Sequence, residues 1–445
     1  MLITNATVVT WENPNSILHD YAIHISEGKI SDIGPAQALK LKYPVDKILD
    51  ANGKMVFPGN ICAHTHFYGT FSRGMAIPGS APSNFAQILE KLWWPLDKSL
   101  TCDDIKYSAL ICEIDAIKHG TTTLIDHHAS PNLIEGSLDI IADTIEQSGL
   151  RAGLCYEVTD RDGDEKTIQG IQENVRFIRD VKKRPATLSA MFGLHAPLTL
   201  SNKTLDTCRN AAPDETGFHI HVSESNDDNN IIRSSQNLKP IEWLNKHGIL
   251  GRNTMAAHCV HIDESEMETL SSSQTWVSHQ PRSNMNNAVG VAPVEKMISK
   301  GIKVCLGNDG FSNSMWDEWK SAYFLHKLKT HDPRSMNGYT VIEMGVQNNS
   351  RFASSLFNTE IGVIKIGAAA DLIIVDYSPP TPMTAGNLPW HILFGFRESM
   401  VLSTIVNGQI LMQDRVLLTL DEIEISARAC ELSQTVWDRY NKSFK

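Results

Sequence analysis

Eight short, apolar runs follow one another through the middle of the chain, and this repeated pattern constrains the fold more than any other feature. Most of the gaps between the runs hold a stretch with helical spacing, for example residues 105–119 and 134–148. The runs cover residues 55–66, 121–128, 151–159, 187–196, 216–224, 254–262, 274–280 and 303–310. Continuously apolar strands that alternate with helices indicate a parallel sheet that is covered on its faces. Eight such units predict a closed (β/α)8 barrel, the TIM barrel.

The alternative for an alternating pattern is an open, doubly wound sheet. Such a sheet usually carries a glycine-rich, phosphate-binding turn after an early strand, and the sequence contains no such turn. A barrel of about 250 residues would also leave room for one smaller domain in a chain of 445 residues. We therefore expect the barrel.

Short alternating runs with strand character flank the barrel region at both ends of the chain. Residues 22–25 and 29–33 show this pattern near the N-terminus, and residues 371–375 and 403–408 show it again near the C-terminus. The final stretch has the apolar spacing of a helix. We expect three parts: a small β-sandwich domain built from residues 1–57 and 358–420, a barrel over residues 58–357, and a C-terminal helix over residues 421–445.

The charge and cysteine content limit the partners and the compartment. The 51 acidic and 40 basic side chains give a net charge of −11, which disfavours nucleic acid and anionic membrane surfaces as partners. No stretch approaches the roughly 20 apolar residues of a membrane span, and the first residues lack the regions of a signal peptide. Eight scattered cysteines without a Cys-x-x-Cys pair favour reduced thiols. We expect a cytoplasmic protein with a small-molecule substrate, and we leave open whether it forms homo-oligomers.

Polar residues that suit metal binding fall at the ends of the predicted strands. The first run ends with His64 and His66, which face the same way because alternate residues of a strand share a face. Further candidates at the ends of later runs are His219, His221, Glu224, His258, His279 and Asp309. The carboxyl ends of the strands are where barrel enzymes place catalysis. Three imidazoles and one carboxylate can hold zinc or iron and leave one position for water.

Taken together, these motifs resemble the amidohydrolase superfamily. The resemblance is carried by HTH at 64–66, HIHVSE at 219–224, AHCVHID at 257–263, SHQPRSNM at 278–285 and LGNDG at 306–310. The flanking segments KMVFPG at 54–59 and GVIKIGAAADL at 362–372 also look like the entry and exit signatures of that superfamily. The most similar branch holds cytosine, guanine and adenosine-type deaminases and triazine hydrolases. Within it, the segments around Phe67, Ser72, Trp93, His127 and Arg282 look most like the SsnA-type aminohydrolases.

The resemblance implies a role for each of the central residues. The metal ligands it implies are His64, His66, His221 and Asp309. His221 is preferred to His219 because the pattern of the branch is His-x-x-Glu, which His221 and Glu224 match. Glu224 would carry a proton to the ring nitrogen of the substrate, and His258 would orient the attacking water. Asp309 would accept the proton of that water.

The fourth run contains no lysine that could bridge a second metal, as happens in some members of the superfamily. The resemblance therefore implies one divalent metal per chain, with zinc in first place and iron as the alternative. A bound divalent metal lowers the pKa of water toward about 7, so that the water can act as a nucleophile at neutral pH.

We expect the substrate to be a planar nitrogen heterocycle that loses an exocyclic amine by hydrolysis. The residues expected to contact it are Trp93, His127, His128, Tyr156, Arg161, His195 and His279. Two other hydrolyses on the same scaffold stay open as alternatives: cleavage of a carbon–chlorine bond in a triazine and opening of a cyclic amide. A remote alternative is a non-catalytic scaffold protein, which is disfavoured because all four ligands are present.

Overall fold

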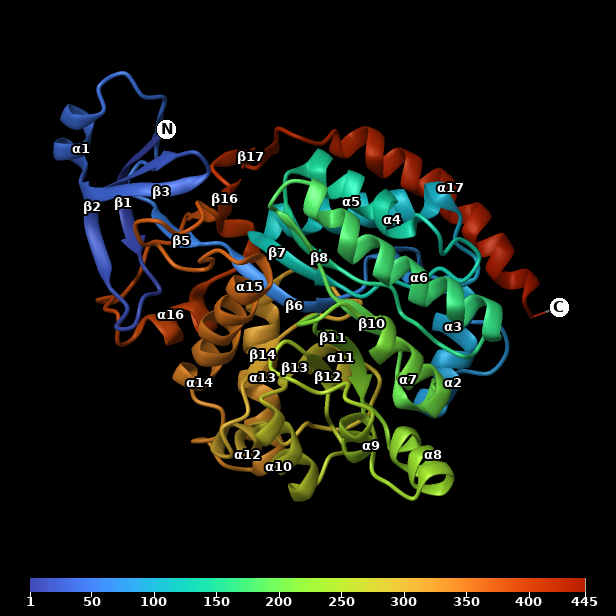
Figure 1. The fold of residues 1–445 in the computed structure, drawn as a ribbon. Coiled ribbons are helices and arrows are strands. Elements are labelled where there is room, and N and C mark those ends of the chain that lie inside the picture. The colour runs from blue at the N-terminus through green and yellow to red at the C-terminus, as the bar shows by residue number, and fades with distance from the viewer. Residues whose placement is uncertain (445) are drawn as a thin grey trace.

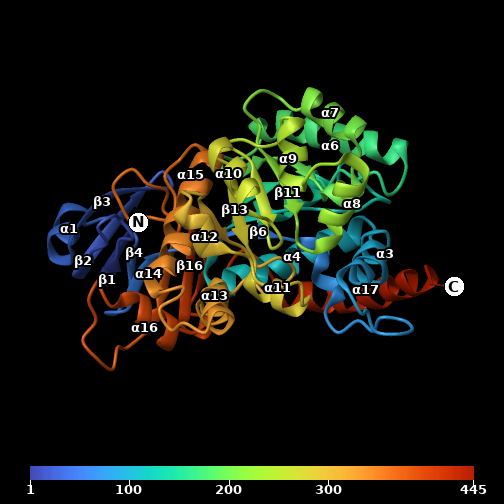
Figure 2. The same cartoon turned by 90° about the horizontal axis from the view of Figure 1, so that it is seen from below.

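The middle of the chain forms the predicted barrel. In the computed structural model, which describes residues 1–444, eight strand positions form two parallel sheets. These positions are occupied by β6 (Asn60–Thr65), β7 (Thr121–Asp126), β8 (Arg151–Leu154), β9 (Leu188–Ala190) with β10 (Phe192–Leu194), β11 (Phe218–Val222), β12 (Met255–His258), β13 (Trp276–His279) and β14 (Val304–Leu306). Figure 2 shows β6, β11 and β13 of these sheets in the middle of the molecule, among the helices. The (β/α)8 prediction is confirmed.

Two parallel sheets, β6 to β9 and β10 to β14, close this barrel. The fourth position is interrupted at Met191, so that β9 pairs with β8 and β10 pairs with β11. The first and last strands meet where the backbone N–H groups of Asn308 and Asp309 donate to the carbonyl oxygen of His64, at 3.0 and 3.1 Å. This closure brings the end of β14 beside the end of β6, where the sequence predicts metal ligands.

Helices cover the outside of the barrel (Figure 1). They include α4 (Cys102–His119), α5 (Ser137–Ser148), α6 (Asp164–Asp180), α7 (Asn202–Ala211), α8 (Asn226–Gln236), α9 (Pro240–Lys246), α10 (Glu264–Ser273), α12 (Val294–Ser299), α13 (Met315–Thr330) and α15 (Asn349–Phe357). Local chemistry fixes their ends: α4 begins with a capping box of Thr101 and Asp104, and it ends at Gly120, whose φ of 73° suits glycine. Within residues 1–444, no helix is long and apolar enough to cross a membrane.

Strands from both chain ends form one mixed sheet beside the barrel. They are β1 (Leu2–Val9), β2 (Ile17–Ser26), β3 (Lys29–Pro35), β4 (Ile48–Asp50), β5 (Met55–Pro58), β15 (Leu372–Val375), β16 (Val401–Val406), β17 (Gln409–Gln413) and β18 (Val416–Leu417). The sheet order is β18-β17-β16-β15-β5-β1-β2-β3, with β4 beside β1. The antiparallel pair of β5 and β15 joins the two ends of the chain, whereas β1 runs parallel to β4 and β5. The β structure is therefore built from both chain ends, as expected, and its strands form one mixed sheet.

One predicted strand needs correction. The run 55–66 is not a single strand, because β5 belongs to the mixed sheet and β6 to the barrel. The chain passes between them at Gly59, where an added Cβ would lie 2.1 Å from Cγ2 of Thr122. Only glycine fits this close approach.

A buried ion pair connects the barrel to the mixed sheet. Arg151 of β8 donates two hydrogen bonds to the carboxylate of Asp371, at 2.8 and 3.2 Å, and both residues are buried. The last helix, α17 (Glu422–Lys442), then returns along α4, where Lys118 pairs with Glu422 at 2.5 Å (Figure 1). This return brings the C-terminal end of the chain to the segment 67–100, which covers the mouth of the barrel.

Candidate active site

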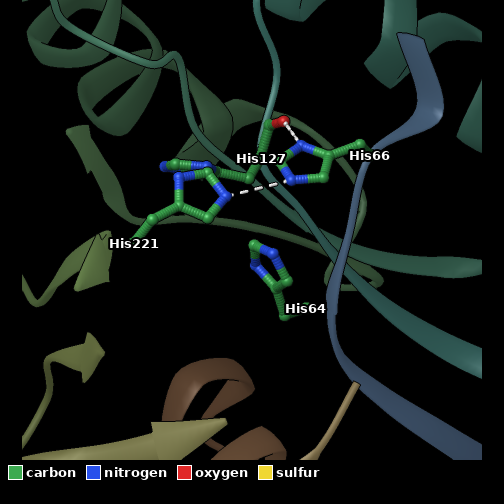
Figure 3. A group of neighbouring side chains, drawn as sticks. All are labelled: His64, His66, His127 and His221. Atoms are coloured by element: carbon green, nitrogen blue, oxygen red, sulfur yellow. Dashed lines mark hydrogen bonds between the residues drawn. The ribbon is translucent and has the colours of Figure 1, made fainter. Parts of the chain in front are cut away.

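The predicted histidine ligands converge at the carboxyl ends of β6 and β11. The Nε2 atoms of His66 and His221 lie 3.1 Å apart, and the ring of His64 lies 4.8 and 5.0 Å from their rings (Figure 3). His64 lies within a register irregularity of β6 between Cys62 and Thr65, and His66 is the first residue after the strand. One ring nitrogen from each of His64, His66 and His221 and one from His127 all lie within 4.8 Å of one another.

The outer hydrogen bonds of two of these rings turn their Nε2 atoms toward each other. Nδ1 of His66 donates to the carbonyl oxygen of His127 at 2.6 Å, and Nδ1 of His221 donates to that of His195 at 2.8 Å. Nε2 of His64 is buried and has no hydrogen-bond partner within the described residues. Burial, with the neighbouring histidines, holds the pKa values of His64 and His221 well below their ordinary range. A metal ion requires imidazole nitrogens that converge on one point; the Nε2 atoms of His66 and His221 meet there beside the unpartnered Nε2 of His64, so this donor set fits one.

Asp309 completes the set from the end of β14. Its Oδ1 lies 3.4 Å from Nε2 of His66, and its Oδ2 accepts a hydrogen bond from the hydroxyl of Ser283 at 2.6 Å. Its φ of 57° is left-handed, which is uncommon outside glycine and is concentrated at functional sites. The carboxylate is therefore held toward the histidines by both the backbone and Ser283.

Glu224 and His258 lie beside this group. Oε2 of Glu224 is 3.4 Å from Nε2 of His258, and Nδ1 of His258 contacts the side-chain oxygen of Asn284 at 3.0 Å. Nδ2 of Asn287 donates to Oε1 of Glu224 at 3.2 Å. Burial and the nearby carboxylate of Asp309 raise the pKa of Glu224 well above its usual range. A raised pKa favours the protonated carboxyl group, which is the form that can donate a proton.

The segment after β13 supplies three partners that sequence reasoning left without a role. Ser283, Asn284 and Asn287 come from α11 (Pro281–Asn286) and the residue that follows it. Each one contacts a different central side chain, namely Asp309, His258 or Glu224. The segment SHQPRSNMNN at 278–287 could have pointed to them, because short polar side chains are concentrated along this short helix at the mouth of the barrel.

Sequence reasoning also missed Glu157. Its buried carboxylate lies 3.2 Å from Nδ1 of His127, 3.5 Å from Nδ1 of His66 and 3.8 Å from Nε2 of His195. Burial alone would raise the pKa of Glu157, but the histidines around it hold that pKa well below its usual range. The alternation of strand residues could have found it, because Cys155 and Glu157 face the barrel interior together.

A cavity of about 190 Å³ opens above the histidines. Its floor includes His66, His221 and Asp309, and Glu224 lies in its wall. Its roof comes from the segment 67–100 and includes Tyr68, Ser72, Phe85, Leu89, Leu92, Trp93, Trp94 and Asp97. Trp93 packs so tightly that a Cβ added at Gly69 or at Gly310 would lie 3.3 Å from its ring.

Three of the seven residues expected to contact substrate lie at or beside this cavity. Trp93 and His195 line it, and His127 lies next to the ligands, with its Nε2 donating to the carbonyl oxygen of His219 at 3.0 Å. His128 points the other way, where its Nε2 contacts the hydroxyl of Ser130 at 2.9 Å. The two neighbouring histidines diverge because consecutive strand residues face opposite sides.

The other three do not reach the cavity wall. The ring of Tyr156 packs over Gly170 of α6, where an added Cβ would lie 3.1 Å from it. His279 turns outward to α13 and contacts His326, with their Nε2 atoms 3.2 Å apart. Arg161 lies behind the roof and pairs with Asp97 at 2.9 Å, so that it reaches the cavity only through that partner.

A scan against family models decides the classification. The model described as "Amidohydrolase family" matches residues 55–411. The chain belongs to this family. The superfamily resemblance seen in the motifs is confirmed, and the match includes every central side chain described above.

Curated relatives extend over nearly the whole chain. The chain is 33% identical to a 5'-deoxyadenosine deaminase of Methanosarcina mazei, over 99% of each protein. It is 32% identical to a 5-methylthioadenosine/S-adenosylhomocysteine deaminase of Pelotomaculum thermopropionicum, over 96% of this chain and 97% of that one. These relatives and the histidine-rich site identify the chain as a metal-dependent deaminase, a hydrolase of carbon–nitrogen bonds other than peptide bonds.

Solved structures confirm the fold. An adenosine deaminase from Xanthomonas campestris with bound zinc superposes with a TM-score of 0.85 at 20% identity, over 98% of both chains. The atrazine chlorohydrolase TrzN from Arthrobacter aurescens, complexed with zinc, gives 0.82 at 20% identity, over 97% of this chain and 99% of that one. Both of these structures contain zinc.

Proposed function

We propose that this family member deaminates adenine-type nucleosides that carry an apolar group at the 5' position. The observation that carries the proposal is the position of Glu224, a buried carboxyl group with a raised pKa, in the wall of the cavity whose floor holds the histidines and Asp309. The 5'-deoxyadenosine and 5-methylthioadenosine deaminases similar to the chain support the nucleoside. Nucleoside deamination also meets the expectation of a planar heterocycle that loses an exocyclic amine.

One divalent metal would be held by His64, His66, His221 and Asp309. Zinc is our choice because the structural relatives bind it, with iron as the alternative. The metal supplies Lewis acidity and lowers the pKa of water toward about 7. The Nε2 atoms of the three histidines converge, and the carboxylate of Asp309 lies beside them; this arrangement supports the ligand set.

The neighbouring side chains would move the protons. Glu224 donates its proton to the ring nitrogen next to the amine-bearing carbon, which makes that carbon electrophilic. His258, held by Asn284, orients the attacking water, and Asp309 accepts one proton of that water and passes it to the amine, which leaves as ammonia. The other proton of the water returns to Glu224 as the carbonyl group of the product forms. The distance of 3.4 Å between Glu224 and His258 supports this shared task.

The remainder of the cavity would bind the sugar and the 5' group. Trp93 offers a ring face for stacking on the base, and stacking of this kind is typical of aromatic side chains. Asp97 lines the cavity and keeps one buried carboxylate oxygen without a partner among the described residues, and a sugar hydroxyl group would satisfy it. Phe85, Leu89 and Leu92 make the outer wall apolar, which disfavours a phosphorylated 5' position.

Two expectations stay predictions. The resemblance to the SsnA-type group concerns the segments of the roof and the mouth, and it does not specify a substrate. Dechlorination of a triazine stays the alternative reaction, because that chemistry uses a similar metal site.

Ammonia release by zinc-loaded protein tests the proposal. The substrates compared are 5'-deoxyadenosine, 5'-methylthioadenosine, S-adenosylhomocysteine, adenosine, AMP, adenine, guanine and a chlorotriazine. We expect the highest kcat/KM with 5'-deoxyadenosine or 5'-methylthioadenosine and the lowest among adenosine derivatives with AMP. A preference for AMP, for a free base or for the triazine would contradict the proposal.

A further inference from the structure

A second histidine of β11 lies directly behind the ligand His64. His219 is fully buried, two residues before His221, and its ring also faces the barrel interior. Its Nε2 atom is 2.9 Å from Nδ1 of His64. The sequence assigns His219 no role, because the His-x-x-Glu pattern selects its neighbour.

The direction of this contact follows from the other nitrogen of His64. Nε2 of His64 faces the other ligands without a partner in the described part of the chain, so a metal would bind there. A neutral imidazole that presents Nε2 to a metal carries its proton on Nδ1. Nδ1 of His64 therefore donates, and Nε2 of His219 accepts.

The contacts on the far side of His219 agree with this direction. Because its Nε2 accepts, its proton lies on Nδ1, which is 3.9 Å from Sγ of Cys155. The thiol of Cys155 donates in turn to the carbonyl oxygen of Asp126 at 3.4 Å. In this direction, every hydrogen of the buried series from His64 through His219 and Cys155 points at an acceptor, and the series ends at the carbonyl oxygen of Asp126.

The three histidine ligands differ in what orients them. His66 and His221 both donate to backbone carbonyl oxygens, which no side-chain substitution removes. His64 alone depends on a side chain. Outer hydrogen-bond partners of metal-binding histidines fix the tautomer and the ring orientation.

We propose that His219 is the positioning residue of His64: it accepts the hydrogen bond that fixes the proton of His64 on Nδ1 and turns Nε2 toward the metal. The inference rests on the ligand set proposed above. It assigns His219 no contact with substrate, so its loss acts on metal binding first.

The test measures the affinity for Zn²⁺ by competition with a chromophoric chelator. His219→Leu removes the acceptor, whereas His219→Gln keeps an acceptor near the position of Nε2. His326→Leu is the matched control, because it replaces another buried histidine, away from the ligands. We expect about 10- to 100-fold weaker binding in His219→Leu. We expect His219→Gln and His326→Leu to stay within about threefold of the wild type, since neither loses the acceptor to His64.

A second readout reports the geometry of the site. The visible absorption spectrum of the Co²⁺-loaded protein should change in His219→Leu and stay unchanged in His326→Leu. If His219→Leu does not fold, His219→Asn replaces it, because the shorter asparagine side chain does not reach His64 and should weaken binding as leucine does. Equal affinities in all His219 variants, or equal losses in leucine and glutamine, would overturn the inference.

A variant of His64 itself separates this inference from the proposed ligand set. His64→Leu should lose most of its affinity for Zn²⁺ if His64 is a ligand. Full affinity in His64→Leu would contradict the proposed ligands themselves. Loss in His64→Leu with full affinity in His219→Leu would contradict only the role of His219.

Discussion

The floor and the roof of the cavity are built in different ways. The floor lies at the ends of barrel strands, and its side chains are oriented by backbone carbonyl groups and by buried polar partners. The roof is the segment 67–100, made of short helices: η1 (Phe67–Ser72), α2 (Phe85–Ile88), η2 (Leu89–Trp93) and α3 (Trp94–Asp97). Barrel register thus sets the geometry of the chemistry, while a less regular segment sets the fit of the substrate.

The roof depends on the other end of the chain. From α17, Nε1 of Trp437 donates to the carbonyl oxygen of Phe71 at 2.8 Å, and Nε of Arg439 donates to that of Ser99 at 2.7 Å. The hydroxyl of Tyr440 also donates to the carbonyl oxygen of Lys91. Substitutions in the floor should therefore act on metal content and kcat, and substitutions in the roof or in α17 should act on KM.

The largest effect is expected from a ligand in the floor. His221→Ala removes one of the proposed ligands, and we expect it to lose the metal and at least ~10³-fold in kcat/KM, because the attacking water loses its activation. Elemental analysis and ammonia release measure the two quantities. An active variant with full metal content would show that His221 is not a ligand.

Glu224→Gln should separate proton transfer from metal binding. The amide cannot donate a proton as the carboxyl group does, so we expect kcat to fall by about 10²-fold or more. Metal content should stay at the wild-type value. Loss of metal in this variant would mean that Glu224 is a ligand and that the roles within the motif at 219–224 are assigned incorrectly.

Trp93→Ala tests the roof. The variant removes a ring face from the cavity, and we expect KM to rise by up to about tenfold, because one aromatic stacking contact contributes up to about 1.5 kcal/mol. Metal content and kcat should change little. A fall in kcat as large as that of Glu224→Gln would contradict the separation of floor and roof.

The smallest effect is expected from α17. Trp437→Phe keeps the apolar ring and removes one hydrogen bond to the roof, worth about 1 kcal/mol, so we expect KM to rise by up to about fivefold. Hydrogen exchange within residues 67–100 should become faster. Thr435→Ala is the control, since this hydroxyl is bonded only to Leu432 of its own helix among the described residues. Equal exchange in both variants would show that α17 does not stabilise the roof.

The sequence predicts the floor well because its signals are local. Alternate positions of a strand share a face, so the strand pattern alone places the pairs His64 with His66 and His219 with His221 inside the barrel. The same rule explains which predictions were wrong. His279 and Tyr156 occupy strand positions that face the surrounding helices, whereas Glu157 occupies a position that faces the cavity.

The roof is less predictable. Trp93 can be named from its position after the first strand, but the bond between Trp437 and Phe71 joins residues 366 positions apart. No periodicity or spacing records such a contact, because it forms only when the C-terminal helix packs on the finished barrel. The sequence pattern also does not reveal that residues 55–66 are divided between two sheets. The chain passes between the sheets at Gly59, where only glycine fits beside Thr122, a residue distant in the sequence.

Anomalous diffraction from crystals of the zinc-loaded protein tests the central claim most directly. We predict one zinc peak per chain, bound by Nε2 of His64, Nε2 of His66, Nε2 of His221 and a carboxylate oxygen of Asp309. Two peaks per chain, or one peak bound by His127 in place of any of these ligands, would contradict it.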